Sequence, residues 1–303
     1  MKDIESWDRQ MIDTSYEPFS RQPEYIEVNK GFIASLHLED CPIVLDLACG
    51  TGTLTECLLE VHRTKEIIGL DISHESLVLA QKHFMNQAFV RDKANNHAKS
   101  ERSSPSRLLF LRGTADCLPF RDQSIHAVVM GNAIHNLPDQ DVLLREIRRI
   151  LKPSGLFAFN TSFFAGTYPP GTENLYHEWL KLALAYIKMK DEERQRQGLS
   201  GIPRKRGTSH QAFSKKWPTP EELARLLIRN SFDVKWFCHR TIMMNQRSLE
   251  TVSAYAGLAR VLLSGYPIKI ACEALQAGAG AAFKAIGIKE VRRLWLEVVA
   301  VRR

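Results

Sequence analysis

The chain has 303 residues, of which 44% are hydrophobic and 25% charged, and it carries a net charge of +7 at pH 7. This composition is typical of a folded globular protein with one elaborated domain or two, and it excludes a disordered chain. The positive charge permits an anionic partner without requiring one.

Targeting and redox features of the sequence favour a cytoplasmic protein. No apolar run approaches the roughly 20 residues that span a bilayer, and residues 1–18 are too polar and acidic for a signal peptide. The cysteines lie far apart, with no CxxC pair, which favours free thiols in a reducing compartment. We therefore expect a cytoplasmic chain with no membrane span and no bound metal.

In chain order, residues 1–40 form a predicted helical arm, and from Pro42 onward short β-branched runs alternate with amphipathic stretches. Strands are predicted at 43–48, 66–72, 108–113, 125–132, 155–162, 232–244 and 291–303. The main helices among them are predicted at 52–62, 73–87, 138–153 and 219–230. The polar residues 91–107 are predicted to form a long surface loop.

This alternation predicts an α/β fold with a doubly wound, mostly parallel sheet, because parallel strands need crossover helices. The predicted parts are an N-terminal helical arm (1–40), a core (41–161), a helical lid insertion (162–218), the rest of the core sheet (219–247 and 291–303) and a second helical insertion (248–290). In the second insertion, "ALQAGAGAAFKAIG" (274–287) follows no strand, so its small residues indicate close helix packing.

The stretch "VLDLACGTGTLTE" (44–56) joins a strand to a helix through a glycine-containing turn. Asp46 ends the strand, and Ala48, Gly50 and Gly52 let a ligand approach the backbone and the helix N-terminus closely. A dinucleotide-binding turn would read G-x-G-x-x-G, but the third glycine position holds Thr55. The acid disfavours a pyrophosphate and suits a cationic group such as an amino acid's ammonium.

"DLACGTG" (46–52) resembles the motif (D/E)-x-(G/A)-x-G-x-G of class I S-adenosylmethionine-dependent methyltransferases. Further elements follow in the family's order: "GLDIS", "GTADCLPF", "VVMGNAIHNLPD" and "REIRRILKPSGLFAF". The resemblance covers about residues 40–160, and the third and fourth elements are most similar to the ubiquinone/menaquinone-biosynthesis-like branch. It implies a Rossmann-like, seven-stranded sheet with an antiparallel last strand, and S-adenosyl-L-methionine as the cofactor.

The resemblance also implies roles for individual residues. Asp71, followed by Ile72, would bind the ribose hydroxyls, while Asp116 and the backbone N–H of Cys117 would contact the adenine. The methionine end of the cofactor would meet residues of the glycine turn and of the fourth strand, namely Asp46, Ala48, Gly50, Gly52, Gly131, Asn132 and His135. Tyr16 and Tyr25 of the N-terminal arm are predicted to close over the same moiety.

Residues for the methyl acceptor are harder to identify. The candidates for catalysis are His135, Glu173 and His177, and the last two share one helical face with Tyr176. The alternative is that Glu173 and His177 are ordinary residues on the surface of a helix, with no role in catalysis. Other polar aromatic residues that could line a pocket are His210, Trp217 and His239.

The sequence therefore predicts a methyltransferase for a small, partly apolar metabolite, such as an isoprenoid or a quinone, in an enclosed pocket. The basic stretch 187–217 leaves room for a carboxylate or diphosphate on that substrate. An RNA methyltransferase, a non-catalytic cofactor-binding regulator and a nicotinamide oxidoreductase are the alternatives. The N/D-P-P-Y/F motif of many nucleobase-amine methyltransferases is missing, so no nucleic acid is expected; a homo-oligomer is left open.

Overall fold

The computed structural model describes residues 17–62, 64–95, 107–204 and 217–303. The chain divides into two compact units. The sheet unit comprises residues 26–164, 218–240 and 295–303, and the helical unit comprises residues 1–25, 165–217 and 241–294. The unit boundaries fall within the strands β6 and β7, which therefore belong partly to each unit.

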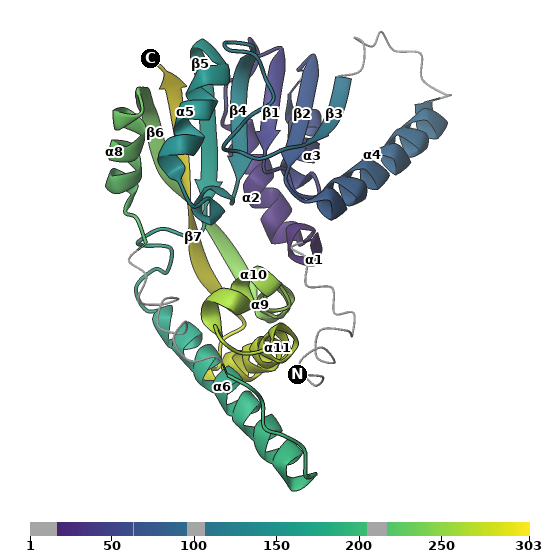
Figure 1. Ribbon diagram of the computed structural model, residues 1–303, viewed down its shortest axis with the longest axis vertical. Coiled ribbons are helices and arrows are strands. Elements are labelled where there is room, and N and C mark those ends of the chain that lie inside the picture. Colours follow the sequence, from purple (N-terminus) through teal and green to yellow (C-terminus); the bar gives the residue numbers. More distant parts are fainter. Residues whose placement is uncertain (1–16, 63, 96–106, 205–216) are drawn as a thin grey trace. The chain divides into compact units, whose positions relative to one another are not determined.

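A seven-stranded sheet with the order β3-β2-β1-β4-β5-β7-β6 forms the core of the sheet unit (Figure 1). Its strands are β1 (Ile43–Leu47), β2 (Glu66–Asp71), β3 (Arg107–Arg112), β4 (Ile125–Gly131), β5 (Leu151–Thr161), β6 (Phe232–Asn245) and β7 (Glu290–Arg302). Strands β1 to β5 pair in parallel, whereas β7 runs antiparallel to β5. The predicted fold class is confirmed. The strand order reverses between β1 and β4, the position where open α/β sheets bind their ligands.

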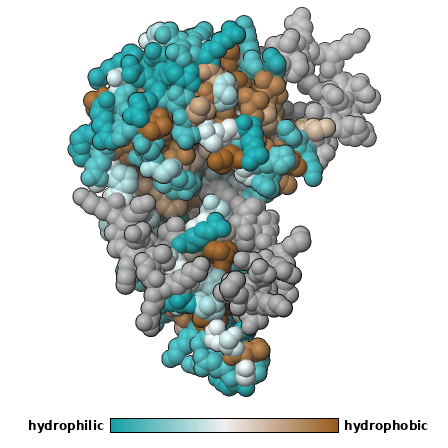
Figure 2. Space-filling view, in the orientation of Figure 1, coloured by the Kyte–Doolittle hydropathy of each residue, from teal (hydrophilic) through white to brown (hydrophobic). Residues whose placement is uncertain are grey.

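The sheet is held by apolar strands and by helices with one apolar face. Val44, Leu45 and Leu47 of β1 are completely buried. The helices of this unit are α3 (Thr53–Val61), α4 (His74–Asn95), α5 (Gln140–Ile150), α8 (Pro220–Arg229) and most of α2 (Pro23–Ala34). In α5 the side chains of Leu143, Leu144, Ile147 and Ile150 are buried and form one apolar face. Hydrophobic side chains gather over strands of this unit, bordered by hydrophilic ones (Figure 2).

Two predicted boundaries are wrong. Residues 91–95, predicted as surface loop, continue helix α4 to Asn95, because this stretch holds good helix formers and neither glycine nor proline. The remainder of that loop, 96–106, lies outside the described residues. Helix α5 ends at Ile150, so that Lys152 and Pro153 belong to β5.

The helical unit contains α1 (Glu17–Ser20), α6 (Glu173–Arg196), α9 (Gln246–Ser253), α10 (Ala256–Leu262) and α11 (Ile268–Ile286). Helices α6 and α11 approach closely, since a Cβ added at Gly278 would lie 2.8 Å from the Trp179 carbonyl oxygen. The indole of Trp179 donates to the Leu275 carbonyl at 2.7 Å. The small residues of 274–287 thus serve helix packing, as predicted. Among the helices described, none is long and apolar enough to cross a membrane.

Candidate functional site

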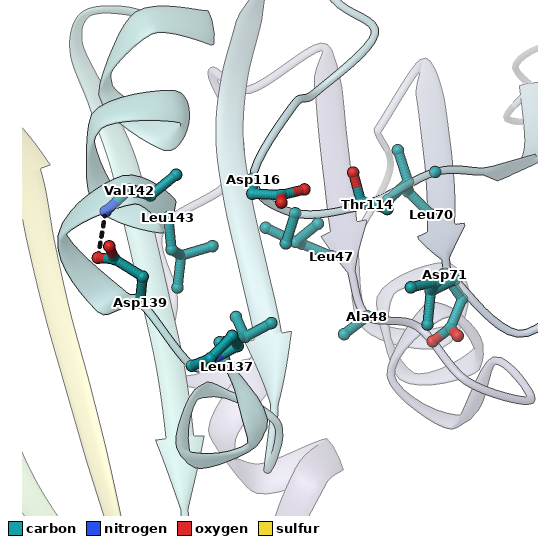
Figure 3. Close-up of a pocket in the computed structure, with 14 residues that line it drawn as sticks. Leu47, Ala48, Leu70, Asp71, Thr114, Asp116, Leu137, Asp139, Val142 and Leu143 are labelled. Carbon is teal, nitrogen blue, oxygen red and sulfur yellow. Dashed lines mark hydrogen bonds between the residues drawn. The ribbon is translucent and has the colours of Figure 1, made fainter.

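A pocket of about 320 Å³ lies at the carboxyl ends of β1 and β2, between the loops that follow β3 and β4 (Figure 3). This volume falls within the roughly 300–1,000 Å³ range of small-molecule sites. Apolar side chains such as Leu47, Leu70 and Leu143 form most of its wall, and three carboxylates join them: Asp71, Asp116 and Asp139. A pocket of this kind suits a flat, largely apolar ring with a few polar groups.

The turn between β1 and α3 has left-handed backbone at Ala48, Gly50 and Gly52, with φ of 59°, 54° and 89°. A Cβ at Gly52 would lie 2.7 Å from the ring of Phe84, whereas a Cβ at Gly50 would meet nothing within 4 Å. Gly52 is therefore required by the protein's own packing. Gly50 faces open space beside the backbone, which a ligand could use.

Asp71 closes this turn from the end of β2. Its two carboxylate oxygens accept the backbone N–H of Gly50 at 2.7 Å and that of Ser73 at 2.8 Å. Each oxygen keeps a further lone pair, and the side chain lines the pocket. Ile72, the next residue, also lines the pocket and is 65% exposed, which is unusual for a large apolar side chain.

Asp46 is completely buried at the end of β1. Its Oδ2 accepts the hydroxyl of Thr55 at 2.6 Å, whereas its Oδ1 has no hydrogen-bond partner. Burial, with a smaller contribution from the negative charge of Asp71, raises the pKa of this carboxyl to about 7, and the hydrogen bond from Thr55 opposes the rise. From the sequence, Thr55 was noted only because it replaces the third glycine of a dinucleotide-binding turn. The feature that could have predicted its hydrogen bond to Asp46 is a hydroxyl in the first turn of the helix that follows this acid.

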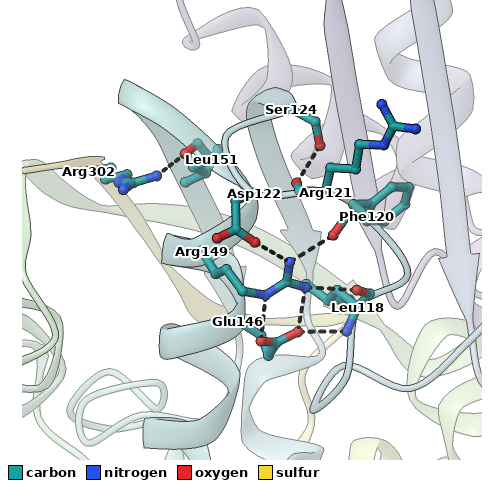
Figure 4. A network of polar contacts seen from close by, with 9 residues as sticks. All are labelled: Leu118, Phe120, Arg121, Asp122, Ser124, Glu146, Arg149, Leu151 and Arg302. Atoms are coloured by element: carbon teal, nitrogen blue, oxygen red, sulfur yellow. Dashed lines mark hydrogen bonds and ion pairs between the residues drawn. The ribbon is translucent and has the colours of Figure 1, made fainter.

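The loop after β3 brings Asp116 to the pocket and leaves Cys117 exposed. Helix α5 holds this loop through two side chains that the sequence analysis did not identify, Glu146 and Arg149 (Figure 4). Glu146 accepts the N–H of Leu118 at 2.8 Å. Arg149 donates to the carbonyls of Phe120 and Leu118, at 2.7 and 2.8 Å, and pairs with Glu146. The position of Asp116 therefore depends on α5.

Asn132, predicted to face the cofactor, joins β4 to β5. It has a φ of 47°, and its N–H donates to the side-chain oxygen of Asn160 at 2.9 Å. Its own Oδ1 accepts the N–H and the hydroxyl of Ser162, at 2.9 and 3.1 Å. Asn160 also donates to Asn29 of α2 at 2.9 Å. Neither Asn160 nor Ser162 was identified from the sequence.

His135 is half-buried in the short helix η1 (Ile134–Asn136) and stacks on Phe163, with ring centroids 3.8 Å apart. Its Nδ1 lies 3.3 Å from the hydroxyl of the buried Thr161, which also accepts the N–H of Phe163 at 3.1 Å. The Thr161 hydroxyl can either donate to Nδ1 or accept from it, because a hydroxyl has one proton and two acceptor lone pairs. Where it donates, the neutral imidazole carries its ring proton on Nε2.

The remaining candidates that the structure describes are not among the residues that line this pocket. Glu173 and His177 are exposed on α6 of the helical unit, where the Glu173 carboxylate accepts the N–H of Gly171 at 2.7 Å. Tyr25 is buried against Phe19 in the same unit, with ring centroids 5.2 Å apart. His239 stacks on Phe164 in the sheet unit. Tyr16 and His210 lie outside the described residues.

The sheet order, the left-handed turn after β1 and the acid that ends β2 together define a class I S-adenosylmethionine-dependent methyltransferase domain. Residues 45–159 match the family of the methyltransferase domain.

Two curated relatives each match less than half of the chain. The chain is 38% identical over 125 residues to a demethylmenaquinone methyltransferase from Lactiplantibacillus plantarum, covering 41% of this chain and 46% of the relative. It is 30% identical over 137 residues to a ubiquinone/menaquinone biosynthesis C-methyltransferase from Legionella pneumophila, covering 44% and 49%. The chain thus spans about half the length of the curated relatives it matches.

Solved structures share the fold over more of the chain. The [4+2]-cyclase SpnF has a TM-score of 0.51 at 14% identity and covers 92% of this chain and 81% of its own. A phosphoethanolamine N-methyltransferase from Haemonchus contortus has a TM-score of 0.51 at 16% identity, covering 95% of this chain and 56% of its own. At these identities the likeness concerns the fold alone.

Proposed function

We propose that the whole chain is an S-adenosyl-L-methionine-dependent methyltransferase whose acceptor is a small, partly apolar metabolite of the quinone, isoprenoid or a related class. The observation that carries the proposal is the unpartnered, completely buried Oδ1 of Asp46 in the glycine turn. A buried carboxylate oxygen without a partner is costly, and a ligand's ammonium group would satisfy it.

The residues that line the pocket, together with Asp46 next to its lining residues Leu47 and Ala48, fit this cofactor. Asp46 would hold the ammonium of its methionine moiety, the free lone pairs of Asp71 would accept its ribose hydroxyls, and the apolar wall with Asp116 would hold its adenine. Bound there, the cofactor supplies a methyl group that its sulfonium has already made electrophilic. The protein's contribution is then to hold the acceptor in line and to exclude water.

His135 would serve the acceptor as a hydrogen-bond donor. This role requires the tautomer in which the Thr161 hydroxyl donates to Nδ1 and the neutral imidazole carries its proton on Nε2. Such a donor stabilises negative charge on an oxygen, for example the phenolate of a quinol, and a phenolate makes the neighbouring ring carbon nucleophilic. The two relatives named for demethylmenaquinone and for C-methylation in quinone biosynthesis are consistent with this class of acceptor. Glu173 and His177 stay predictions for the acceptor side.

The test is methyl transfer to a panel of acceptors followed by mass spectrometry. The panel contains a short-chain naphthoquinol without its ring methyl, simple phenols, isoprenoid alcohols and transfer RNA. We expect one added methyl group on the quinol or another small acceptor, and none with Asp46→Ala. Methylation of the RNA alone would contradict the proposed substrate class.

A further inference from the structure

A second set of buried polar groups lies within the helical unit, at Tyr168, Tyr176 and Arg293. Tyr176 of α6 is 3% exposed, and its hydroxyl is buried without a hydrogen-bond partner. Its ring packs on that of Tyr168, with centroids 4.2 Å apart. An orphaned buried hydroxyl costs stability unless a ligand completes it, so it needs an explanation.

A buried positive charge accompanies this hydroxyl. Arg293 at the start of β7 is 8% exposed, and its guanidinium carbon lies 5.3 Å from the centre of the Tyr168 ring. Its Nε donates to the hydroxyl oxygen of Thr167 at 3.3 Å, and Thr167 in turn donates to the Leu294 carbonyl at 2.9 Å. Burial raises the pKa of Tyr176, while the positive charge of Arg293 opposes that rise. The phenol therefore stays protonated, as a donor near a cation.

The chemistry of these groups selects the ligand. A cation is disfavoured beside Arg293, and a purely apolar group would leave the Tyr176 proton unsatisfied. An oxyanion accepts hydrogen bonds from both a hydroxyl and a guanidinium. The ring of Trp217 lies beside that of Tyr168, with centroids 6.0 Å apart. These aromatic rings would keep water away from an oxyanion bound to Tyr176 and Arg293.

We propose that Tyr176 and Arg293 form a binding site for an oxyanion, a carboxylate or phosphate group, within the helical unit. Its assignment to the methyl acceptor rests on the proposed function, whereas the anion site itself does not. The acceptor would then carry one anionic group on an otherwise apolar body. Tyr176 binds by donation and Arg293 by charge.

The test is isothermal titration of the full chain with two probes, inorganic phosphate and acetate, at constant ionic strength and without cofactor. The variant is Tyr176→Phe, which removes a hydroxyl that lacks a partner and should leave folding intact. The matched control is Tyr186→Phe on the same helix, where Lys190 lies 5.9 Å from the tyrosine ring. Thermal unfolding without added anion checks that both variants fold.

We expect saturable binding of one probe to the wild type and the control, and an affinity about tenfold lower in Tyr176→Phe. Preference for phosphate or for acetate identifies the group. No saturable binding to the wild type, or equal binding to Tyr176→Phe, would overturn the anion site. S-adenosylhomocysteine binding, measured in parallel, tests the proposed function separately, because Tyr176→Phe should leave it unchanged.

Discussion

The ionised, buried carboxylate of Asp46 destabilises the ligand-free protein, and a bound ammonium group would offset this cost. An aspartate in water has a pKa of about 4. Burial in the fold raises the pKa of Asp46 to about 7. Between these values the folded state binds more protons than the unfolded chain, so the free energy of unfolding decreases as pH rises. The stability from this group is fully present below about pH 4 and is lost by about pH 7.

Asp46→Asn should therefore stabilise the ligand-free protein at pH 8 by on the order of 1–3 kcal/mol, since it removes a buried charge and keeps an acceptor for Thr55. The same change should weaken S-adenosylhomocysteine binding at least tenfold, because no carboxylate remains for the ammonium group. Denaturant unfolding and calorimetry measure the two effects. A variant that is less stable at pH 8 yet binds normally would contradict this role.

The affinity for S-adenosylhomocysteine should depend on pH through the same residue. Below pH 7 the Asp46 carboxyl of the ligand-free protein is protonated, and binding an ammonium group must release that proton. We expect the Kd to fall about tenfold per pH unit as pH rises from 5.5 to 6.5, and to level off above about 7.5. Titrations in buffers of different ionisation enthalpy would show the proton release at pH 6. A flat profile in the wild type would exclude Asp46 as the ammonium partner.

Thr161 controls how His135 presents its protons. Thr161→Val keeps the shape and removes the hydroxyl that pairs with Nδ1, so this contact no longer favours one tautomer of the imidazole. We expect kcat for methyl transfer to fall about tenfold with a changed pH profile, while S-adenosylhomocysteine affinity is unchanged. An unaltered pH profile of kcat would show that His135 does not serve the acceptor.

At the scale of elements, helix α5 holds in place the loop after β3, which is a separate part of the chain. Arg149 spans from Glu146 to the carbonyls of Leu118 and Phe120 and so fixes the stretch that brings Asp116 to the pocket. The pKa of Glu146 is lowered mainly by its hydrogen bond from Arg149, so the pair stays charged over the working pH range.

Arg149→Met should free this loop and weaken S-adenosylhomocysteine binding about three- to tenfold without touching the pocket, because the ligand must then order the loop. Arg148→Met is the matched control, since Arg148 is the exposed neighbour on the same helix. Calorimetry on both variants decides the matter. Equal losses in the two variants would point to a general effect of charge.

The elements themselves were largely predictable. Buried β-branched runs such as Ile43–Leu47 and the one-sided apolar face of α5 carry their own periodicity. The end of α4 was not predictable, because a polar stretch with few apolar residues can form either a helix or a loop. The roles of Thr55 and Arg149 depend on contacts across the fold, which no local pattern encodes.

At the scale of the whole molecule, the cofactor side was predictable and the acceptor side was not. Asp46, Gly50 and Gly52 belong to one local turn, and Asp71 ends the next strand, which lies beside it. Tyr176 and Arg293, by contrast, are far apart in the sequence and come together only through the packing of the helical unit. Glu173 and His177 proved exposed, whereas Tyr176, which was predicted to share their face, is buried, since helical spacing alone does not tell which side is buried.

The central claim is that the turn of Asp46 and Asp71 binds S-adenosylmethionine. Titration of the full chain with S-adenosylhomocysteine and with NAD, in the wild type and in Asp71→Asn, tests it most directly. We predict binding of one S-adenosylhomocysteine per chain, at least tenfold weaker binding in the variant because Asn lacks one of the two acceptors, and no binding of NAD. Binding of NAD without S-adenosylhomocysteine, or equal affinity in Asp71→Asn, would contradict the claim.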